Sequence, residues 1–232
     1  REPKRIRQQQ RPIESERDAA LYLEGLINLE RSAQSSGARM DLAPIRALLA
    51  RVGNPERELR CVHVAGSKGK GSVSLLCEAL LGECGLRVGT FTSPHLARWT
   101  ERFRIGGREV EGETLARAVE ALRPHIDALQ ASGPPPSFFD ATTAAALLLF
   151  RDARVDAAVL EVGLGGRLDS TNVVWPAVTC IASIELEHTD RLGTTLAAIA
   201  GEKAGIAKPG VPLVVGALPA EALAVVEARA CE

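Results

Sequence analysis

The sequence lacks an excess of charge of either sign, long uncharged apolar runs, and any paired pattern of cysteines. Its 28 Lys and Arg balance 29 Asp and Glu, which leaves no general basic face for nucleic acid. No apolar run is long enough and charge-free enough to span a bilayer, and the N-terminal stretch lacks the apolar core of a secretory signal. We therefore expect a cytoplasmic, monomeric protein that binds neither membranes nor nucleic acid.

The cysteines are odd in number, and none shows the spacing of a metal site. Four lie inside apparent strands and helices (Cys61, Cys77, Cys84 and Cys180), and Cys231 lies near the end of the sequence. They are predicted to be small, reduced core residues.

What is present fits one large compact α/β domain. The 232 residues are 46% hydrophobic and 25% charged, enough to bury a sizeable core. The opening "REPKRIRQQQRP" is basic and poor in apolar residues. It predicts a disordered tail over residues 1–18, with contact to nucleic acid as the alternative, and a folded domain over residues 19–232.

Strand-like and helix-like segments alternate along the chain. Apolar runs predict strands at 59–65, 86–93, 156–163, 176–184 and 211–216. Helical periodicity predicts helices after the loop at 66–72 and at 113–129, 140–153, 195–206 and 219–230. This alternation predicts an α/β fold of P-loop type, with a mostly parallel sheet flanked by helices.

The first of these helices is predicted to pack on the sheet through one apolar face and to end at Gly85. Its apolar residues recur at helical spacing. They are Val73, Leu76, Cys77, Leu80 and Leu81.

The stretch "HVAGSKGKGSVSLL" resembles a phosphate-binding loop, although a glycine separates Lys70 from Ser72. Unhindered backbone N–H groups, a helix N-terminus and an ammonium group are what a polyphosphate needs. We expect Lys70 to pair with the β- and γ-phosphates and Ser72 to offer its hydroxyl to Mg²⁺. The alternative is an ordinary glycine-rich turn. The predicted nucleotide-binding residues are Gly66, Ser67, Lys68, Gly69, Lys70, Gly71 and Ser72.

Polar residues also follow the other predicted strands, at the edge of the sheet where ligands bind. Their oxygen donors with one imidazole suit Mg²⁺ beside a nucleotide better than a structural zinc ion. Each taken alone could be an ordinary satisfied polar residue. They are Ser93, Pro94, His95, Glu161, Glu185, Glu187, His188 and Asp190.

Five motifs in order resemble folylpolyglutamate synthase and dihydrofolate synthase, members of the Mur ligase superfamily. They are "LLARVGNPER", "VAGSKGKGS", "SPHL" followed by "ERFRI", "LEVGLGGRLDSTN" and "HTDRLGTTLAAIAGEKAGIAKPG". The resemblance runs from about Leu21 to the C-terminus. Cell-wall Mur ligases share the glycine loop and the later lysine, whereas "SPHL" and "EVGLGGRLD" favour the folate branch.

The resemblance implies an ATP-dependent amide ligase with a domain like the central domain of Mur ligases. ATP would phosphorylate a carboxylate of dihydropteroate or of a folate, and the amine of L-glutamate would then displace phosphate. By the same resemblance the catalytic residues are Lys70, Lys203 and His188. The implied Mg²⁺ ligands are Ser72, Ser93, Glu161, His188 and Lys203, with His188 serving a second ion.

Lys203 matches a lysine that is often carbamylated in this family, which would make it an anionic ligand for a metal ion. Carbamylation needs a neutral amine, so we expect Lys203 in a desolvated pocket beside a cation. The alternative is an ordinary lysine on a helix surface. The resemblance also allows K⁺ as a cofactor.

Several positions depart from the family pattern. Ser67 and Lys68 replace the usual Thr-Asn, and Asp140 replaces a glutamate. Glu185 replaces a glycine beside the metal site, where a side chain could crowd it. We expect Glu185 to point away from that site, because alternate residues of a strand end face opposite sides.

Members of this family continue well beyond the point where this sequence stops. The resemblance therefore implies an incomplete ATP-binding domain at 19–232 without the C-terminal glutamate-binding domain, so that this chain alone would ligate little. Two alternatives stay open. One is a cell-wall amino-acid ligase, and the other is a non-catalytic nucleotide-binding module.

Overall fold

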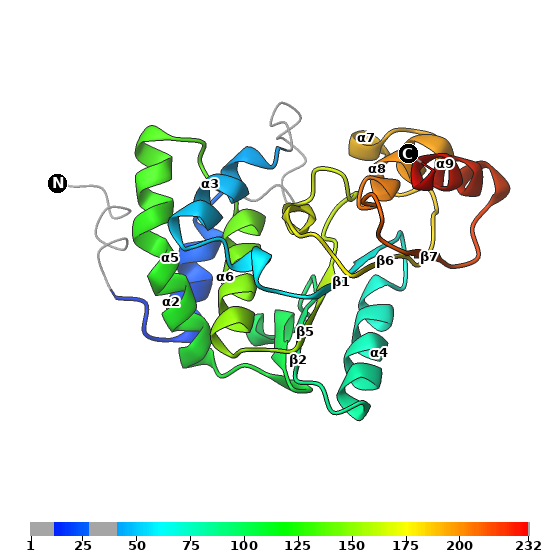
Figure 1. The fold of residues 1–232 in the computed structure, drawn as a ribbon. Coiled ribbons are helices and arrows are strands. Elements are labelled where there is room, and N and C mark those ends of the chain that lie inside the picture. Colours follow the sequence, from blue (N-terminus) through cyan, green and yellow to red (C-terminus); the bar gives the residue numbers. More distant parts are fainter. Residues whose placement is uncertain (1–11, 28–40, 232) are drawn as a thin grey trace.

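A computed structural model describes residues 12–27 and 41–231. Within these ranges one sheet has the order β4-β3-β2-β5-β1-β6-β7 (Figure 1). Its strands are β1 (Cys61–Ala65), β2 (Val88–Phe91), β3 (Phe103–Ile105), β4 (Arg108–Glu109), β5 (Ala157–Glu161), β6 (Val178–Ile181) and β7 (Leu213–Val215).

Most of the sheet is parallel, which confirms the predicted fold class. Parallel pairs join β2 to β5, β5 to β1, β1 to β6, and β6 to β7. The exceptions are β3 and β4, which pair antiparallel at one edge and were not predicted. Gly106 and Gly107 connect them with φ of 59° and 78°, a conformation that favours glycine and suits a tight hairpin.

Helices cover both faces of the sheet. Figure 1 shows α2, α3, α5 and α6 on one side, α4 on the other, and α7 to α9 near β6 and β7. The α-helices are α2 (Glu16–Glu24), α3 (Ala43–Arg51), α4 (Lys70–Glu83), α5 (Gly112–Ser132), α6 (Phe138–Asp152), α7 (Thr189–Leu192), α8 (Leu196–Ala204) and α9 (Ala220–Ala230). Short 3₁₀ helices are η1 (Pro55–Arg57), η2 (Trp99–Arg102) and η3 (Ser170–Val173).

The hydrophobic cores on the two faces of the sheet differ in size. The larger core lies under α2, α3, α5 and α6, and α6 is buried along nearly its whole length. On the other face α4 covers the buried valines Val64, Val88 and Val159. The strands are therefore held mainly from one side.

The predicted apolar face of α4 is partly wrong. Leu76 and Leu80 are 62% and 67% exposed. Glu78 is buried instead, and its Oε2 accepts a hydrogen bond from Arg104 Nε of β3 at 2.9 Å. Glu78 thus takes a buried position on α4, whose buried face was expected to be apolar. Of the predicted face, Val73, Cys77 and Leu81 pack on the valines.

Ordered structure begins before residue 19, inside the stretch expected to be a tail. The Ser15 side chain caps α2 by accepting from Asp18 N, and Ile13 is buried. Residues 1–11 of that stretch lie outside the described residues. The prediction for the cysteines was also partly wrong, because Cys84 and Cys231 are exposed, although all five are free thiols.

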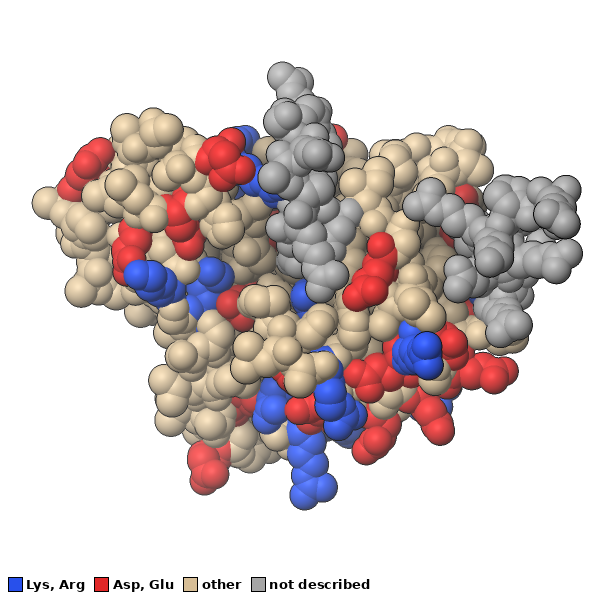
Figure 2. Space-filling view, turned by 180° about the vertical axis from the view of Figure 1, so that it is seen from behind, with Lys and Arg blue, Asp and Glu red and all other residues tan. Residues whose placement is uncertain are grey.

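Charges are mixed on the surface. On the face in Figure 2, Lys and Arg side chains lie among Asp and Glu side chains, so this face is not a uniformly basic surface. Across the described part of the chain, none of the helices combines the length and the apolar character that crossing a membrane requires.

Candidate functional site

The glycine loop lies between the end of β1 and the start of α4. Gly66 has φ of 151°, and a Cβ there would come within 3.1 Å of Ser183 N. Gly69 has φ of 77° and turns the chain into the helix, which begins at Lys70. The first turn of a helix leaves its N–H groups without partners in the helix, and its dipole is positive there. The loop therefore presents an anion-binding helix start.

Hydrogen bonds fasten this loop to the segment that follows β6. Ser67 N donates to Ser183 O at 2.9 Å, and Lys68 N donates to Ser183 Oγ at 2.8 Å. Glu185 N donates to Ser67 Oγ at 2.9 Å. The loop conformation is thus held by the segment that follows β6.

Two lysines converge on the carbonyl of Gly66. Lys70 Nζ and Lys203 Nζ each donate to Gly66 O at 2.9 Å. Lys203 is 1% exposed, and its Nζ also donates to Glu187 Oε1 at 2.7 Å; we name Lys203 and Glu187 the inner pair. Burial lowers the pKa of Lys203, Glu187 opposes this, and Lys70 lowers the pKa further. This confirms the predicted desolvated pocket beside a cation, whereas carbamylation stays a prediction.

A second lysine–glutamate contact lies at the exposed rim of the loop. Lys68 Nζ and Glu185 Oε2 are 2.6 Å apart, and we name these residues the outer pair. The hydrogen bond with Glu185 raises the pKa of Lys68. Glu185 thus contacts Lys68, and it is Glu187 that contacts Lys203. The argument from alternating strand faces was wrong, because β6 ends at Ile181 and Glu185 lies on a loop.

Glu161 ends β5 directly beside the loop. Its Oε2 accepts from Ser93 N at 3.0 Å and lies 3.5 Å from where a Cβ on Gly71 would be. The carboxylate is buried, which raises its pKa to about 7, while the Ser93 N–H and the nearby Lys70 ammonium lower it. A cation bound beside Glu161 would stabilise the charged form of this buried carboxylate, as Lys70 already does in part.

The predicted metal ligands are only partly brought together. Ser93 and Glu161 are in contact, and Lys203 contacts Glu187. His188 is exposed and starts α7 with φ of 45°, a left-handed conformation. Among residues 12–27 and 41–231, no cluster of three or more His, Cys, Asp or Glu could hold a metal ion. The roles of Ser72, Ser93, Glu161, His188 and Lys203 as metal ligands all stay predictions.

A buried polar chain supports the loop after β5, and the sequence did not reveal it. Asp169 Oδ2 accepts from Gly163 N and Leu164 N at 3.1 and 2.9 Å, and Asp169 Oδ1 accepts from the Thr171 hydroxyl. His63 Nε2 lies 2.8 Å from Thr171 Oγ1. Burial raises the pKa of Asp169 to about 6 and lowers that of His63 to about 3. These hydrogen bonds fix the backbone just beyond Glu161.

The loop after β2 is fixed by two residues of the "ERFRI" motif. Glu101 accepts hydrogen bonds from Leu96 N, Ala97 N and Arg98 N, at 2.7 to 2.9 Å. Arg102 Nε donates to His95 Nδ1 at 2.8 Å. The Arg102 guanidinium also lies over the rings of Trp99 and Phe138. The motif pointed to Glu101 and Arg102, but the spacing of its residues did not predict these contacts.

Asp140, the position that departs from the family pattern, links α6 to η3. Its Oδ1 accepts from Ser170 Oγ at 2.6 Å, and its Oδ2 accepts from Ser137 Oγ at 2.7 Å. Burial raises the pKa of this carboxyl, and the serine hydrogen bonds oppose the shift. Asp140 therefore keeps a carboxylate that is used to position the chain.

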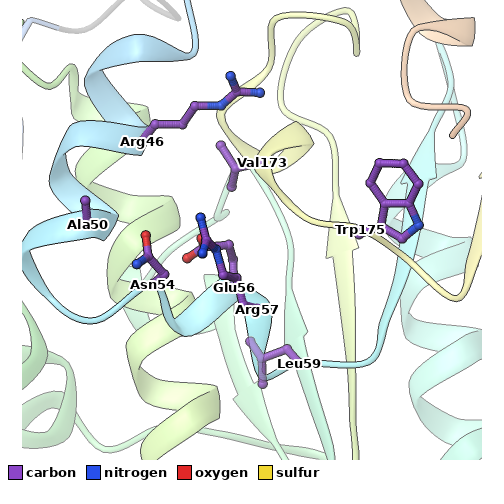
Figure 3. Close-up of a pocket in the computed structure, with 8 residues that line it drawn as sticks. All are labelled: Arg46, Ala50, Asn54, Glu56, Arg57, Leu59, Val173 and Trp175. Atoms are coloured by element: carbon purple, nitrogen blue, oxygen red, sulfur yellow. The ribbon is translucent and has the colours of Figure 1, made fainter.

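The motif "LLARVGNPER" forms the end of α3 and η1, and lines a separate cavity of about 510 Å³ (Figure 3). Asn54 has φ of 54°, and the Glu56 side chain is 10% exposed. The cavity shares no residue with the glycine loop. Its lining residues are Arg46, Ala50, Asn54, Glu56, Arg57, Leu59, Val173 and Trp175.

Comparisons with known proteins agree on one family, although no family model matches the chain. A dihydrofolate synthase/folylpolyglutamate synthase of Bacillus subtilis is 43% identical over 196 residues, which cover 84% of this chain and 46% of the relative. The apo form of the folylpolyglutamate synthase (FPGS) of L. casei aligns with a TM-score of 0.86 at 36% identity, covering 94% of this chain and 52% of the other.

A solved structure described as an FPGS–AMPPCP–folate complex aligns with a TM-score of 0.84 at 37% identity. It covers 94% of this chain and 52% of the other. The match spans 46% of the Bacillus subtilis relative and 22% of a probable bifunctional folylpolyglutamate synthase/dihydropteroate synthase of Haloferax volcanii, so the chain covers less than half the length of either.

Proposed function

Since the chain belongs to the folylpolyglutamate synthase and dihydrofolate synthase family, we propose that it is the nucleotide-binding part of an ATP-dependent ligase. The ligase joins L-glutamate to dihydropteroate or to a folate. AMPPCP and folate in the name of a similar structure support ATP and a folate as substrates. We further propose that the protein is a cytoplasmic monomer.

One observation carries this proposal: Glu161 and Lys70 lie together at the start of α4. Gly71 approaches Glu161, and Lys70 lies close enough to lower the pKa of that carboxyl. Free N–H groups at the start of a helix and an ammonium group suit the phosphates of a nucleotide. A buried carboxylate next to them suits the cation that accompanies the phosphates.

The chemistry needs positioning and charge neutralisation more than a protein nucleophile. A carboxylate oxygen of the acceptor attacks the γ-phosphorus, and the bond to ADP breaks. The amine of glutamate then attacks the acyl carbon, inorganic phosphate leaves, and the nitrogen loses a proton. Lys70, held at 2.9 Å from Gly66 O, would turn to the phosphates and offset their charge as they are transferred.

The residues present fit Mg²⁺. Glu161 supplies a carboxylate, and Ser72 and Ser93 supply hydroxyl groups at neighbouring positions, so they would hold the ion together with nucleotide phosphates. The bound ion would neutralise phosphate charge. Ser93 N, which donates to Glu161 at 3.0 Å, would fix the orientation of the carboxylate.

We also propose that Lys203 is carbamylated when the site is assembled. Its lowered pKa favours the neutral amine, which adds to CO₂ and releases one proton to give a carbamate. The carbamate would lose its attraction to Glu187, so a cation, Mg²⁺ or K⁺, would have to bind beside both anions. Incorporation of ¹³C-labelled CO₂, followed by NMR, tests this step.

Phosphate release from ATP by the whole ligase, measured with and without L-glutamate and the acceptor, tests the proposed function. A ligase of the folate branch requires dihydropteroate or a folate together with glutamate. Release that occurs only with a cell-wall precursor would favour the cell-wall branch. Binding of AMPPCP without release under any condition would favour the non-catalytic module.

A further inference from the structure

The two departures from the family pattern at the rim of the glycine loop contact each other. Lys68 and Glu185, the outer pair, are 2.6 Å apart. Resting on the proposed nucleotide binding, we propose that Lys68 is an additional cation for the nucleotide phosphates and that Glu185 competes with them for it. The outer pair would thereby set the affinity of this protein for nucleotide.

Both members of the outer pair are held in place by their backbones. Lys68 N donates to Ser183 Oγ at 2.8 Å, and Ser183 Oγ donates to Lys68 O at 3.0 Å. Ser67 Oγ accepts from Glu185 N at 2.9 Å and lies 3.2 Å from Glu185 O. The two side chains therefore start from fixed points on adjoining loops, and only their ends can rearrange.

Exposure makes the outer pair easy to exchange. The side chains of Lys68 and Glu185 are 77% and 47% exposed. Exposed ion pairs are weak, because water screens both charges. A triphosphate carries more charge than one carboxylate and can displace it from an ammonium group. Once released, Glu185 remains solvated at little cost.

Lys68 belongs to the same glycine loop as Lys70, which we propose contacts the phosphates. It lies two residues before Lys70, between Gly66 and the start of α4. Glu187, from the same segment as Glu185, also raises the pKa of Lys68. Each of these glutamates contacts a lysine of the site. Nucleotide would replace the exposed glutamate and leave the buried one.

Calorimetric titration with the Mg²⁺ complex of AMPPCP on four proteins tests this proposal: the unaltered protein, Glu185→Gln, Lys68→Gln and the double variant. We expect Glu185→Gln to tighten binding about fivefold and Lys68→Gln to weaken it about tenfold. With Lys68 removed, Glu185→Gln should change affinity by less than about twofold, because Glu185 acts through Lys68. Asp152→Asn, which removes one exposed acidic charge from the end of α6, controls for net charge.

Two results would overturn the proposal. An equal effect of Glu185→Gln with and without Lys68 would show that Glu185 acts by simple repulsion of the nucleotide. No effect of Lys68→Gln would show that Lys68 does not reach the phosphates. If the unaltered protein bound no AMPPCP, the proposed function would fail with it, whereas binding with additive effects would defeat only this inference.

Discussion

Two lysine–glutamate pairs flank one loop, and they differ mainly in burial. In the inner pair Lys203 is 1% exposed and also donates to Gly66 O. In the outer pair both side chains are largely in water. A buried charge that loses its partner is costly, whereas an exposed one is rehydrated. Breaking the inner pair therefore needs a compensating change, such as the proposed carbamate with its cation, whereas the outer pair can respond to a ligand directly.

The largest expected effect breaks the inner pair. In the whole ligase, Lys203→Ala should lower the rate of ATP- and glutamate-dependent ligation by about 10³-fold, because the proposed carbamate ligand for a cation is lost. Short-chain carboxylic acids should partly restore the rate by entering the space that Lys203 fills. Steady-state assays with and without propionate measure both effects, and Lys203→Met, which fills the space, should not be rescued. Full activity of Lys203→Ala would contradict the assigned role.

A somewhat smaller effect is expected at the other lysine on Gly66. Lys70→Ala should weaken AMPPCP binding about 100-fold, because the loop dipoles cannot replace a full positive charge. Lys70→Arg should also fail, since a planar guanidinium does not fit a site formed around a compact ammonium group. Calorimetry measures both variants. Unchanged affinity in Lys70→Ala would mean that the loop holds nucleotide through its backbone alone.

The inner pair should also contribute more than the outer pair to the free energy of unfolding. Glu187→Gln leaves Lys203 buried without its carboxylate and should lower the free energy of unfolding by about 3 kcal/mol near neutral pH. The loss should be smaller at high pH, where Lys203, with its lowered pKa, can shed its proton. Urea unfolding at two pH values measures this. An equal loss at both values would show that Lys203 is neutral in the native protein.

The buried hydrogen bonds that join His63, Thr171 and Asp169 should make the stability of the protein depend on pH. His63 has a pKa lowered to about 3, so protons bind more readily to the unfolded chain, and the contribution of His63 to stability falls as the pH drops below 6.5; Asp169, whose pKa is raised to about 6, contributes in the opposite direction. Between pH 7 and pH 5 His63 contributes a loss of about 2 kcal/mol. His63→Gln, which keeps a donor for Thr171, should remove this part of the slope. Parallel slopes for both proteins would exclude His63 as its source.

Much of the fold could be predicted from the sequence, because buried strands and flanking helices impose patterns on the order of apolar residues. The strands at 61–65 and 157–161 and the helices at 112–132 and 138–152 were predicted with only their ends misplaced. The β3–β4 hairpin was not predicted, although the Gly106-Gly107 pair is a typical turn sequence. The burial of Glu78 in α4 had no signal, because its partner Arg104 lies 26 residues away in the sequence.

The residues of the site could be predicted from the sequence, but the contacts between its lysines and glutamates could not. Local spacing indicated the glycine loop and the strand-end residues, since chemistry needs those residue types there. Which glutamate contacts which lysine depends on where the segment after β6 leaves the sheet. That segment is not a strand, so neither helical nor strand periodicity could place Glu185 or Glu187.

The smallest expected effect concerns the outer pair and completes the contrast with Glu187→Gln. Glu185→Gln should change the melting temperature of the protein without nucleotide by less than about 1 °C, because both partners are exposed and water replaces the lost contact. The hydrogen bond from Glu185 N to Ser67 Oγ does not involve the side chain and should persist. Differential scanning calorimetry at low and high salt measures the change. A salt-sensitive shift as large as that of Glu187→Gln would show that the exposed rim, and not the buried end, anchors the loop.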